Sequence, residues 1–163
     1  MKKFLALVLT VVLCVAFVGC TVVKETDNAA HYVIATDKGF SPFEFQDKEG
    51  NIVGIDMDIL AAIADDQGFT YDLQYIGWDA AIAACQAGQA NGMIAGASIT
   101  EERKANGWTF SEGYYDATQG MAVSKDSTIT KFEDLNGLKV AVKNGTMSNQ
   151  YAESIKDQYG FEV

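Results

Sequence analysis

The chain has 163 residues, of which 48% are hydrophobic and 21% charged, an ordinary composition for a globular protein. This length indicates one domain or slightly more. The formal net charge of −10 argues against nucleic acid or an anionic membrane surface as a binding partner.

The N-terminus has the features of a secretion signal. A basic start precedes an almost wholly apolar stretch over residues 4–18, shorter than the ~20 apolar residues of a membrane-spanning helix. The stretch leads to Phe17-Val18-Gly19-Cys20, which resembles a bacterial lipobox. We predict a lipoprotein signal peptide over 1–19, lipidation of Cys20 and a flexible tether over 20–30. The alternatives are an uncleaved anchor helix and cleavage without lipid.

Strands and helices alternate through the first half of the domain. We predict strands at 31–36, 43–46, 51–54, 71–76 and 93–94, and helices at 57–67 and 80–87, from their apolar patterns. Gly68 is expected to cap the first helix and Asp79 to begin the second. This order predicts an α/β layered domain with a largely parallel sheet.

The second half has weaker patterns. We predict extended segments at 108–111 and 120–124, a short helix over 130–135, a strand at 138–142, a helix over about 147–159 and the start of a further strand at 160–163. Thr130 and Glu133 have the spacing of a capping box. The turn Asn144-Gly145-Thr146 leads into the last helix.

Three cysteines are present. Cys14 lies in the signal and Cys20 would carry lipid, so Cys85 is left without a disulfide partner. Cys85 stands at helical spacing from Ala81 and Ile82, so we expect it to act as a small buried hydrophobic residue. A reactive thiol is the alternative.

The stretch from Gly92 to Arg103 is the best candidate for a binding site. Small residues follow the apolar pair at 93–94, where a backbone can approach a ligand closely. Thr100 has the position of a helix N-cap, and Arg103 is the only arginine in the chain. A planar cation beside such a turn suits a carboxylate ligand. A lone arginine in a first helical turn can also be an ordinary solvated residue.

Segments 36–43, 54–59, 96–103 and 142–148, in this order, resemble the polar amino-acid-binding family 3 of extracytoplasmic solute-binding proteins, which serve ABC importers. The glutamine- and histidine-binding members are the most similar. The resemblance implies a periplasmic-binding-protein-like type II clamshell of two α/β lobes joined by a two-strand hinge. It implies that lobe one occupies 31–119 without its C-terminal return, and that 120–163 form the crossing and the first part of lobe two. We therefore interpret the sequence as a partial chain.

The resemblance also implies a ligand site. Arg103 would hold the carboxylate of an amino acid, together with Thr146 and the backbone N–H near Met147. The ammonium would meet the carbonyl of Ala95 or Gly96 and the hydroxyl of Ser98. The family's acidic partner for the ammonium would lie beyond residue 163.

The identity of the ligand side chain stays open. By the same resemblance, Phe40 and Trp78 would surround it, although both could equally pack in the core. Asp37 favours an amide or a cation at the distal end, whereas Lys143 favours an acid or an amide.

We expect a lipid-anchored monomer in the periplasm or on the outer face of the cytoplasmic membrane. It would deliver an amino acid to the transmembrane permease subunits of an ABC importer, without catalysis, metal, cofactor or nucleic acid. The alternatives are a carboxylate-based lyase similar to cyclohexadienyl dehydratase, a sensor module and a non-binding remnant. The single histidine, His31, lies at the start of the domain, which argues against a Ser-His-Asp triad.

Overall fold

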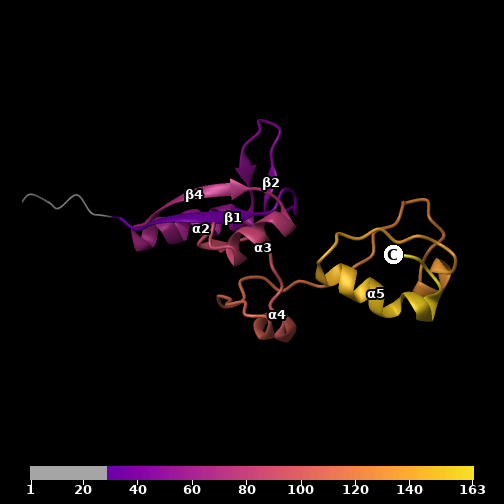
Figure 1. Ribbon diagram of the computed structural model, residues 1–163. Helices are drawn as coiled ribbons and strands as arrows, with labels where there is room; N and C mark the ends of the chain where they lie inside the picture. Colours follow the sequence, from indigo (N-terminus) through magenta and orange to yellow (C-terminus); the bar gives the residue numbers. More distant parts are fainter. Residues whose placement is uncertain (1–28) are drawn as a thin grey trace, which may run out of the picture.

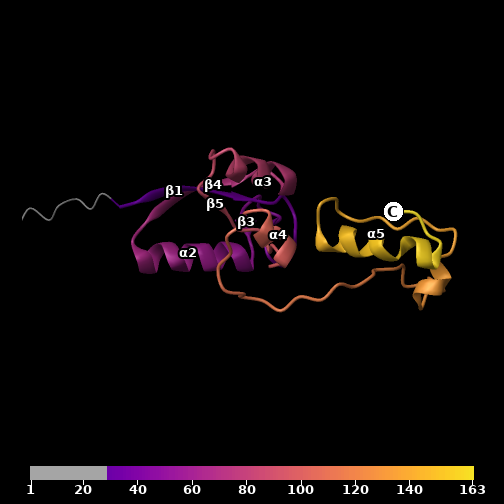
Figure 2. The ribbon, with the colours of Figure 1, turned by 60° about the horizontal axis from the view of Figure 1, so that its bottom comes forward.

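The computed structural model describes residues 29–163, so the predicted signal peptide, Cys20 and most of the tether lie outside the described residues. Two units are joined by one irregular chain crossing (Figures 1 and 2). The α/β unit holds the elements up to α4 (Glu101–Ala105), and the smaller α5 unit holds η1 (Phe132–Leu135) and α5 (Met147–Tyr159). No helix among the described residues is long and apolar enough to cross a membrane. The elements in chain order are β1 (His31–Thr36), β2 (Phe45–Gln46), β3 (Ile52–Val53), α2 (Ile55–Gln67), β4 (Thr70–Tyr75), α3 (Trp78–Gln86), β5 (Gly92–Met93), α4 (Glu101–Ala105), η1 (Phe132–Leu135) and α5 (Met147–Tyr159).

The core of the α/β unit is a parallel sheet in the order β4-β1-β5, as the alternation of strands and helices predicted. Helices α2 and α3 lie on opposite sides of it (Figure 2). The α3 side buries small side chains, and Cys85 packs against them as a partly buried hydrophobic residue. These buried small residues are Ala35, Ala81, Ala84 and Ala90. Because all three strands run in the same direction, their carboxyl ends share one edge of the sheet.

Strands β2 and β3 form the predicted hairpin, with Phe45 opposite Val53. The Asp47 carboxylate closes its turn by accepting the backbone N–H groups of Glu49 and Asn51 at 3.0 and 2.8 Å. The Asn51 amide also donates to this carboxylate, and these bonds lower the pKa of Asp47. An Asx-type turn therefore sets the register of this short pair.

Gly54 joins the hairpin to α2 in a conformation that requires glycine. Its φ is +133°, and a Cβ atom there would lie 2.2 Å from the carbonyl oxygen of Phe43. Gly54→Ala is therefore expected to lower the free energy of unfolding by about 2 kcal/mol, because both backbone strain and overlap must be relieved. Urea denaturation would measure it.

Gly68 is the control for that substitution. It caps α2 with φ +68° and has open space around its missing Cβ. Gly68→Ala is expected to cost only about 1 kcal/mol. Equal losses in the two variants would contradict the contact argument at Gly54.

Two predicted helix starts are wrong by two residues each. Helix α3 begins at Trp78, with Gly77 in place of Asp79 as its N-cap. Gly77 has φ +96° and its carbonyl accepts the N–H of Ala81 at 2.8 Å, so the helix begins two residues earlier than Asp79 suggested. Helix α2 begins at Ile55, so the acidic side chains at 56 and 58 lie in its first turn.

The predicted strand at 138–142 is wrong, because this segment makes only an isolated parallel bridge between Lys139 and Glu162. Two backbone hydrogen bonds to Glu162 hold it, so no continuous ladder forms. The extended segments at 108–111 and 120–124 likewise form no strand among the described residues.

The predicted capping box at 130–133 is also wrong. The short helix here is the 3₁₀ helix η1, and the carboxylate that serves its start is Asp134 rather than Glu133. Asp134 accepts the backbone N–H groups of Thr130 and Lys131 at 2.9 and 3.2 Å. The N-cap is Lys131, one residue later than predicted, so the acidic residue at the third helical position is Asp134.

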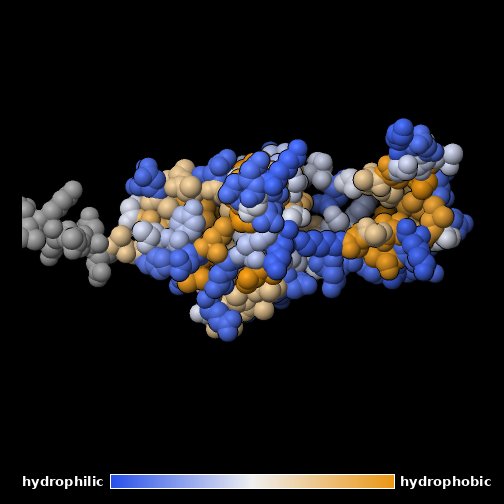
Figure 3. Space-filling model, turned by 90° about the horizontal axis from the view of Figure 1, so that it is seen from above, coloured by the Kyte–Doolittle hydropathy of each residue, from blue (hydrophilic) through white to orange (hydrophobic). Residues whose placement is uncertain are grey.

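Helix α5 has the predicted bounds. The Thr146 hydroxyl accepts the N–H of Asn149 at 3.3 Å, and Gly160 ends the helix with φ +68°. Its buried Ala152 packs with Leu135 and Phe161. A hollow of about 990 Å³ opens beside this small core, and apolar side chains are prominent on this unit in Figure 3.

Candidate functional site

The predicted binding residues of the α/β unit gather at the carboxyl edge of the sheet. Asp37 follows β1, Trp78 follows the turn after β4, and the small residues Ala95 and Gly96 follow β5. Open α/β sheets bind ligands at this edge, because several strand ends bring loops together there. The fold thus assembles residues separated by some 60 positions in the chain.

Arg103 lies at the centre of this cluster. Its guanidinium carbon is 5.2 Å from the centre of the Trp78 ring and 5.1 Å from that of Trp108. One nitrogen, Nη1, donates to the carbonyl of Ser98 at 2.8 Å. Burial lowers the pKa of Arg103, and Glu102 opposes that effect. Two aromatic faces and a short carbonyl contact therefore hold the fork in one orientation.

The local sequence places Arg103 as predicted. The Thr100 hydroxyl accepts the backbone N–H of Arg103 at 3.1 Å, which confirms Thr100 as the N-cap of α4. The second tryptophan was missed. Trp108 was expected only in an extended segment, and its spacing of five residues from Arg103 was the available signal.

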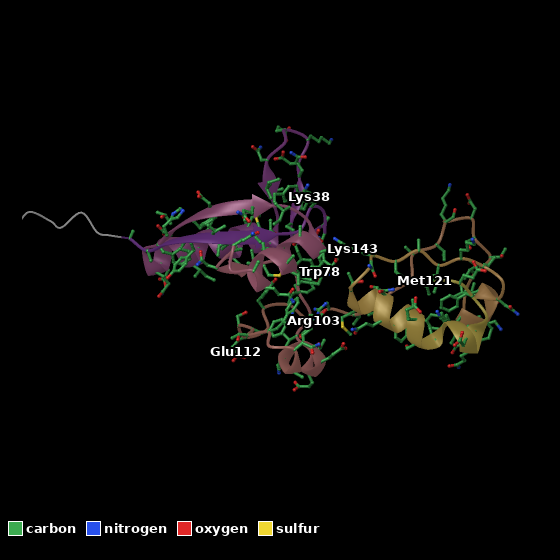
Figure 4. All side chains as sticks on the ribbon, in the orientation of Figure 1. Lys38, Trp78, Arg103, Glu112, Met121 and Lys143 are labelled. Carbon is green, nitrogen blue, oxygen red and sulfur yellow. The ribbon has the colours of Figure 1, made fainter. Side chains whose placement is uncertain are left out.

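The α5 unit reaches this cluster through Gly145. Its carbonyl accepts Nε1–H of Trp78 at 3.2 Å and lies 3.4 Å from Nη2 of Arg103. Gly145 has φ +68°, and a Cβ atom would lie 3.2 Å from the indole nitrogen, so glycine permits this approach. Figure 4 shows Trp78, Arg103 and Lys143 on the facing sides of the two units.

Lys143 and Asp37 form an ion pair between the two units. The Asp37 side chain is 5% exposed, whereas that of Lys143 is 46% exposed. The second carboxylate oxygen of Asp37 accepts the N–H of Lys38 at 2.6 Å. The residues whose ligand preferences conflicted in the sequence are thus direct neighbours, and they present an anion and a cation side by side.

The turn after β5 is tightly packed. Ala95 is buried, and Gly96 has φ +54° with the rings of Phe40 and Phe43 against it. A Cβ atom at Gly96 would lie 2.8 Å from the Phe40 ring. Phe40 stacks on Phe43 with ring centres 5.0 Å apart and remains 45% exposed. One face of the Phe40 ring therefore packs on Phe43, and the rest of the ring is exposed to solvent.

Thr146 and Met147 lie at the N-terminus of α5, beside Gly145. The Thr146 hydroxyl donates to the Lys143 carbonyl at 2.6 Å and accepts from Asn149, so it acts as a cap here. The backbone N–H groups of this first turn point toward the N-terminal end of the helix, which suits an anion. Their role toward a ligand stays a prediction.

A buried acidic group beneath the site was not predicted as such. Glu44 and Asp56 are both fully buried, and Asp56 was expected only to begin a helix. Neither carboxyl oxygen of Glu44 has a hydrogen-bond partner among the described residues. Burial, then repulsion from Asp56 and Asp37, raises the pKa of Glu44 to about 9. An acid between two aromatics, Phe43 and Phe45, was the signal in the sequence.

The chain is similar to proteins that bind amino acids. The family described as bacterial extracellular solute-binding proteins, family 3, matches residues 32–160. The arginine-binding extracellular protein ArtP of Bacillus subtilis (strain 168) is 30% identical over 166 residues, which cover 100% of this chain and 64% of that protein.

Two solved structures show the same architecture. An ancestral arginine-binding protein bound to arginine superposes with a TM-score of 0.75 at 36% identity, covering 82% of this chain and 59% of that one. An ancestral arginine-binding protein bound to glutamine gives a TM-score of 0.74 at 34% identity, with the same coverage of 82% and 59%. The chain thus spans about 60% of the length of these relatives, and its fold is of the periplasmic-binding-protein type II class.

Proposed function

Because the chain belongs to the bacterial extracellular solute-binding proteins of family 3, we propose that it captures a polar L-amino acid outside the membrane and presents it to the permease of an ABC importer. The observation that carries the proposal is Arg103 between two tryptophans, at the meeting of the two units. Lipidation at Cys20 and a lobe boundary near Gly120 belong to the same proposal.

Arg103 is the proposed carboxylate site. Its contact with the neutral Gly145 carbonyl is long, at 3.4 Å, so a ligand carboxylate would replace it with shorter, charge-assisted bonds. The first-turn N–H groups at Thr146 and Met147 would bind the same carboxylate from the α5 unit. A carboxylate held by both units would favour their closed arrangement.

The ammonium of the ligand would bind the turn after β5. The carbonyl of Ala95 or Gly96 and the hydroxyl of Ser98 supply acceptors within one short segment. The Ser98 carbonyl already accepts from Arg103, so the cation and the ammonium acceptors share one rigid turn. The two charges of an α-amino acid are also close together, because the ammonium nitrogen and the carboxylate carbon are both bonded to the same carbon.

The Asp37–Lys143 pair favours an amide at the distal end of the ligand side chain. An amide oxygen can accept from Lys143 while its NH₂ donates to Asp37, whereas a cation would meet repulsion from Lys143. Phe40 and Trp78 would flank the aliphatic part. We therefore place glutamine first and arginine, which relatives bind, second.

Isothermal titration calorimetry with glutamine, arginine, histidine and glutamate tests the proposal. Wild-type protein is expected to bind glutamine most tightly. Lys143→Met should lower the affinity for glutamine about tenfold. It should raise the affinity for arginine, because the Asp37 carboxylate then has no other cation beside it.

Lys139→Met is the matched control, since Lys139 is an exposed lysine of the same unit whose ion pair with Glu162 is on the surface. It should leave the order of affinities unchanged. Failure of wild-type protein to bind any of the four amino acids would contradict the proposed function. Turnover of prephenate or arogenate would support the lyase instead.

A further inference from the structure

Asp56 connects three separate parts of the α/β unit. It lies in the first turn of α2 and is fully buried. One carboxylate oxygen, Oδ2, accepts the backbone N–H of Gly96 at 2.7 Å. The other, Oδ1, accepts the hydroxyl of Tyr114 at 2.8 Å. A single side chain thus holds residues 40 and 58 positions away in sequence.

The bond to Gly96 holds the turn that presents the proposed ammonium acceptors. The Phe40 and Phe43 rings pack closely against the Cα of Gly96, and the Asp56 carboxylate accepts its N–H. The opposite end of the turn is held by Arg103 at the Ser98 carbonyl. Because hydrogen bonds fix both ends of this turn, the carbonyl groups of residues 95 and 96 are held in one orientation.

The bond to Tyr114 holds the segment that leads toward the α5 unit. Burial, and then the hydrogen bond to Asp56, raise the pKa of the Tyr114 phenol, so the hydroxyl keeps its proton and donates. The next residue, Tyr115, packs its edge on Phe43 with ring centres 5.0 Å apart. The Asp56 carboxylate and the Phe43 ring therefore contact both the turn at residues 95–98 and the start of the chain crossing.

We propose that Asp56 is a positioning residue for ligand recognition, which orients the 95–98 turn toward the ligand ammonium and ties it to the chain crossing through Tyr114. This inference rests on the proposed function. Its consequence is specific: loss of the Asp56 bonds should impair recognition of the α-ammonium more than recognition of the rest of the ligand.

The test compares L-glutamine with glutaramate, which lacks only the α-amino group, by isothermal titration calorimetry. Tyr114→Phe is expected to lower the affinity for glutamine about tenfold and to leave the affinity for glutaramate within about twofold of the wild-type value. Tyr115→Phe removes a neighbouring hydroxyl and is the matched control; it should change neither. Asp56→Asn should restore part of the affinity lost in Asp56→Ala, because its amide oxygen can still accept the Gly96 N–H.

Equal weakening of both ligands by Tyr114→Phe and Asp56→Ala, or no weakening, would overturn the inference. A second readout needs no ligand: hydrogen exchange at the Gly96 amide should be at least about tenfold faster in Asp56→Ala than expected from its change in global stability. Wild-type protein that binds neither ligand would overturn the proposed function, whereas unchanged Gly96 exchange would overturn only the hold of Asp56 on the turn.

Discussion

Arg103→Ala is expected to lower the affinity for the bound amino acid by about a thousandfold, or about 4 kcal/mol. The variant would leave the ligand carboxylate beside the rings of Trp78 and Trp108 without its cation. Removing one partner of a desolvated ion pair costs more than the pair contributes, because the remaining charge is left unpaired. Calorimetric titration with the amino acid preferred by wild-type protein measures the loss.

Two further variants sharpen this test. Arg103→Lys keeps the charge but loses the planar fork and its stacking on the rings, so it should recover only part of the affinity. Lys104→Ala removes the adjacent cation, which pairs on the surface with Glu101 at 2.8 Å, and should leave binding intact. An Arg103→Ala variant that binds as well as wild type would place the carboxylate elsewhere.

Glu44→Gln is expected to stabilise the protein as the pH rises. Burial raises the folded pKa of Glu44 to about 9, above its ordinary value of 4.5, so between these values the folded state holds a proton that the unfolded state releases. The wild-type free energy of unfolding should therefore fall with pH through this window. Each pH unit inside this window is worth ~1.4 kcal/mol, so over the three units between pH 5 and pH 8 we expect the variant to gain about 4 kcal/mol on wild type.

Urea denaturation of both proteins at several pH values measures this gain. The slope with pH is the decisive quantity, because the cost of burying the glutamine amide is the same at each pH. Glu49→Gln, an exposed change in the same hairpin, reports the contribution of net charge alone. Parallel pH profiles for wild type and Glu44→Gln would show that Glu44 ionises in the folded protein as it does in the unfolded one.

The order and type of the main elements of the α/β unit could be predicted because they depend on local patterns. The β-branched and aromatic segment His31–Thr36 forms a strand that is buried only toward its carboxyl end, Thr100 caps α4, and Gly68 ends α2 in the left-handed conformation. Each of these signals acts within a few residues of chain. The strand at 138–142 failed because a strand also needs a neighbour along its whole length, and this is a property of other parts of the chain.

The family and the parallel α/β plan could both be predicted from the amino-acid sequence, which also singled out Arg103 as the candidate carboxylate ligand. The contacts of these residues became visible only in the fold: Trp108 lies beside Arg103, Lys143 pairs with Asp37, and Asp56 joins Gly96 to Tyr114. The reason is physical. Local conformation follows from neighbouring residues, whereas the pairing of buried charges depends on which distant segments the fold brings to the carboxyl edge of the sheet.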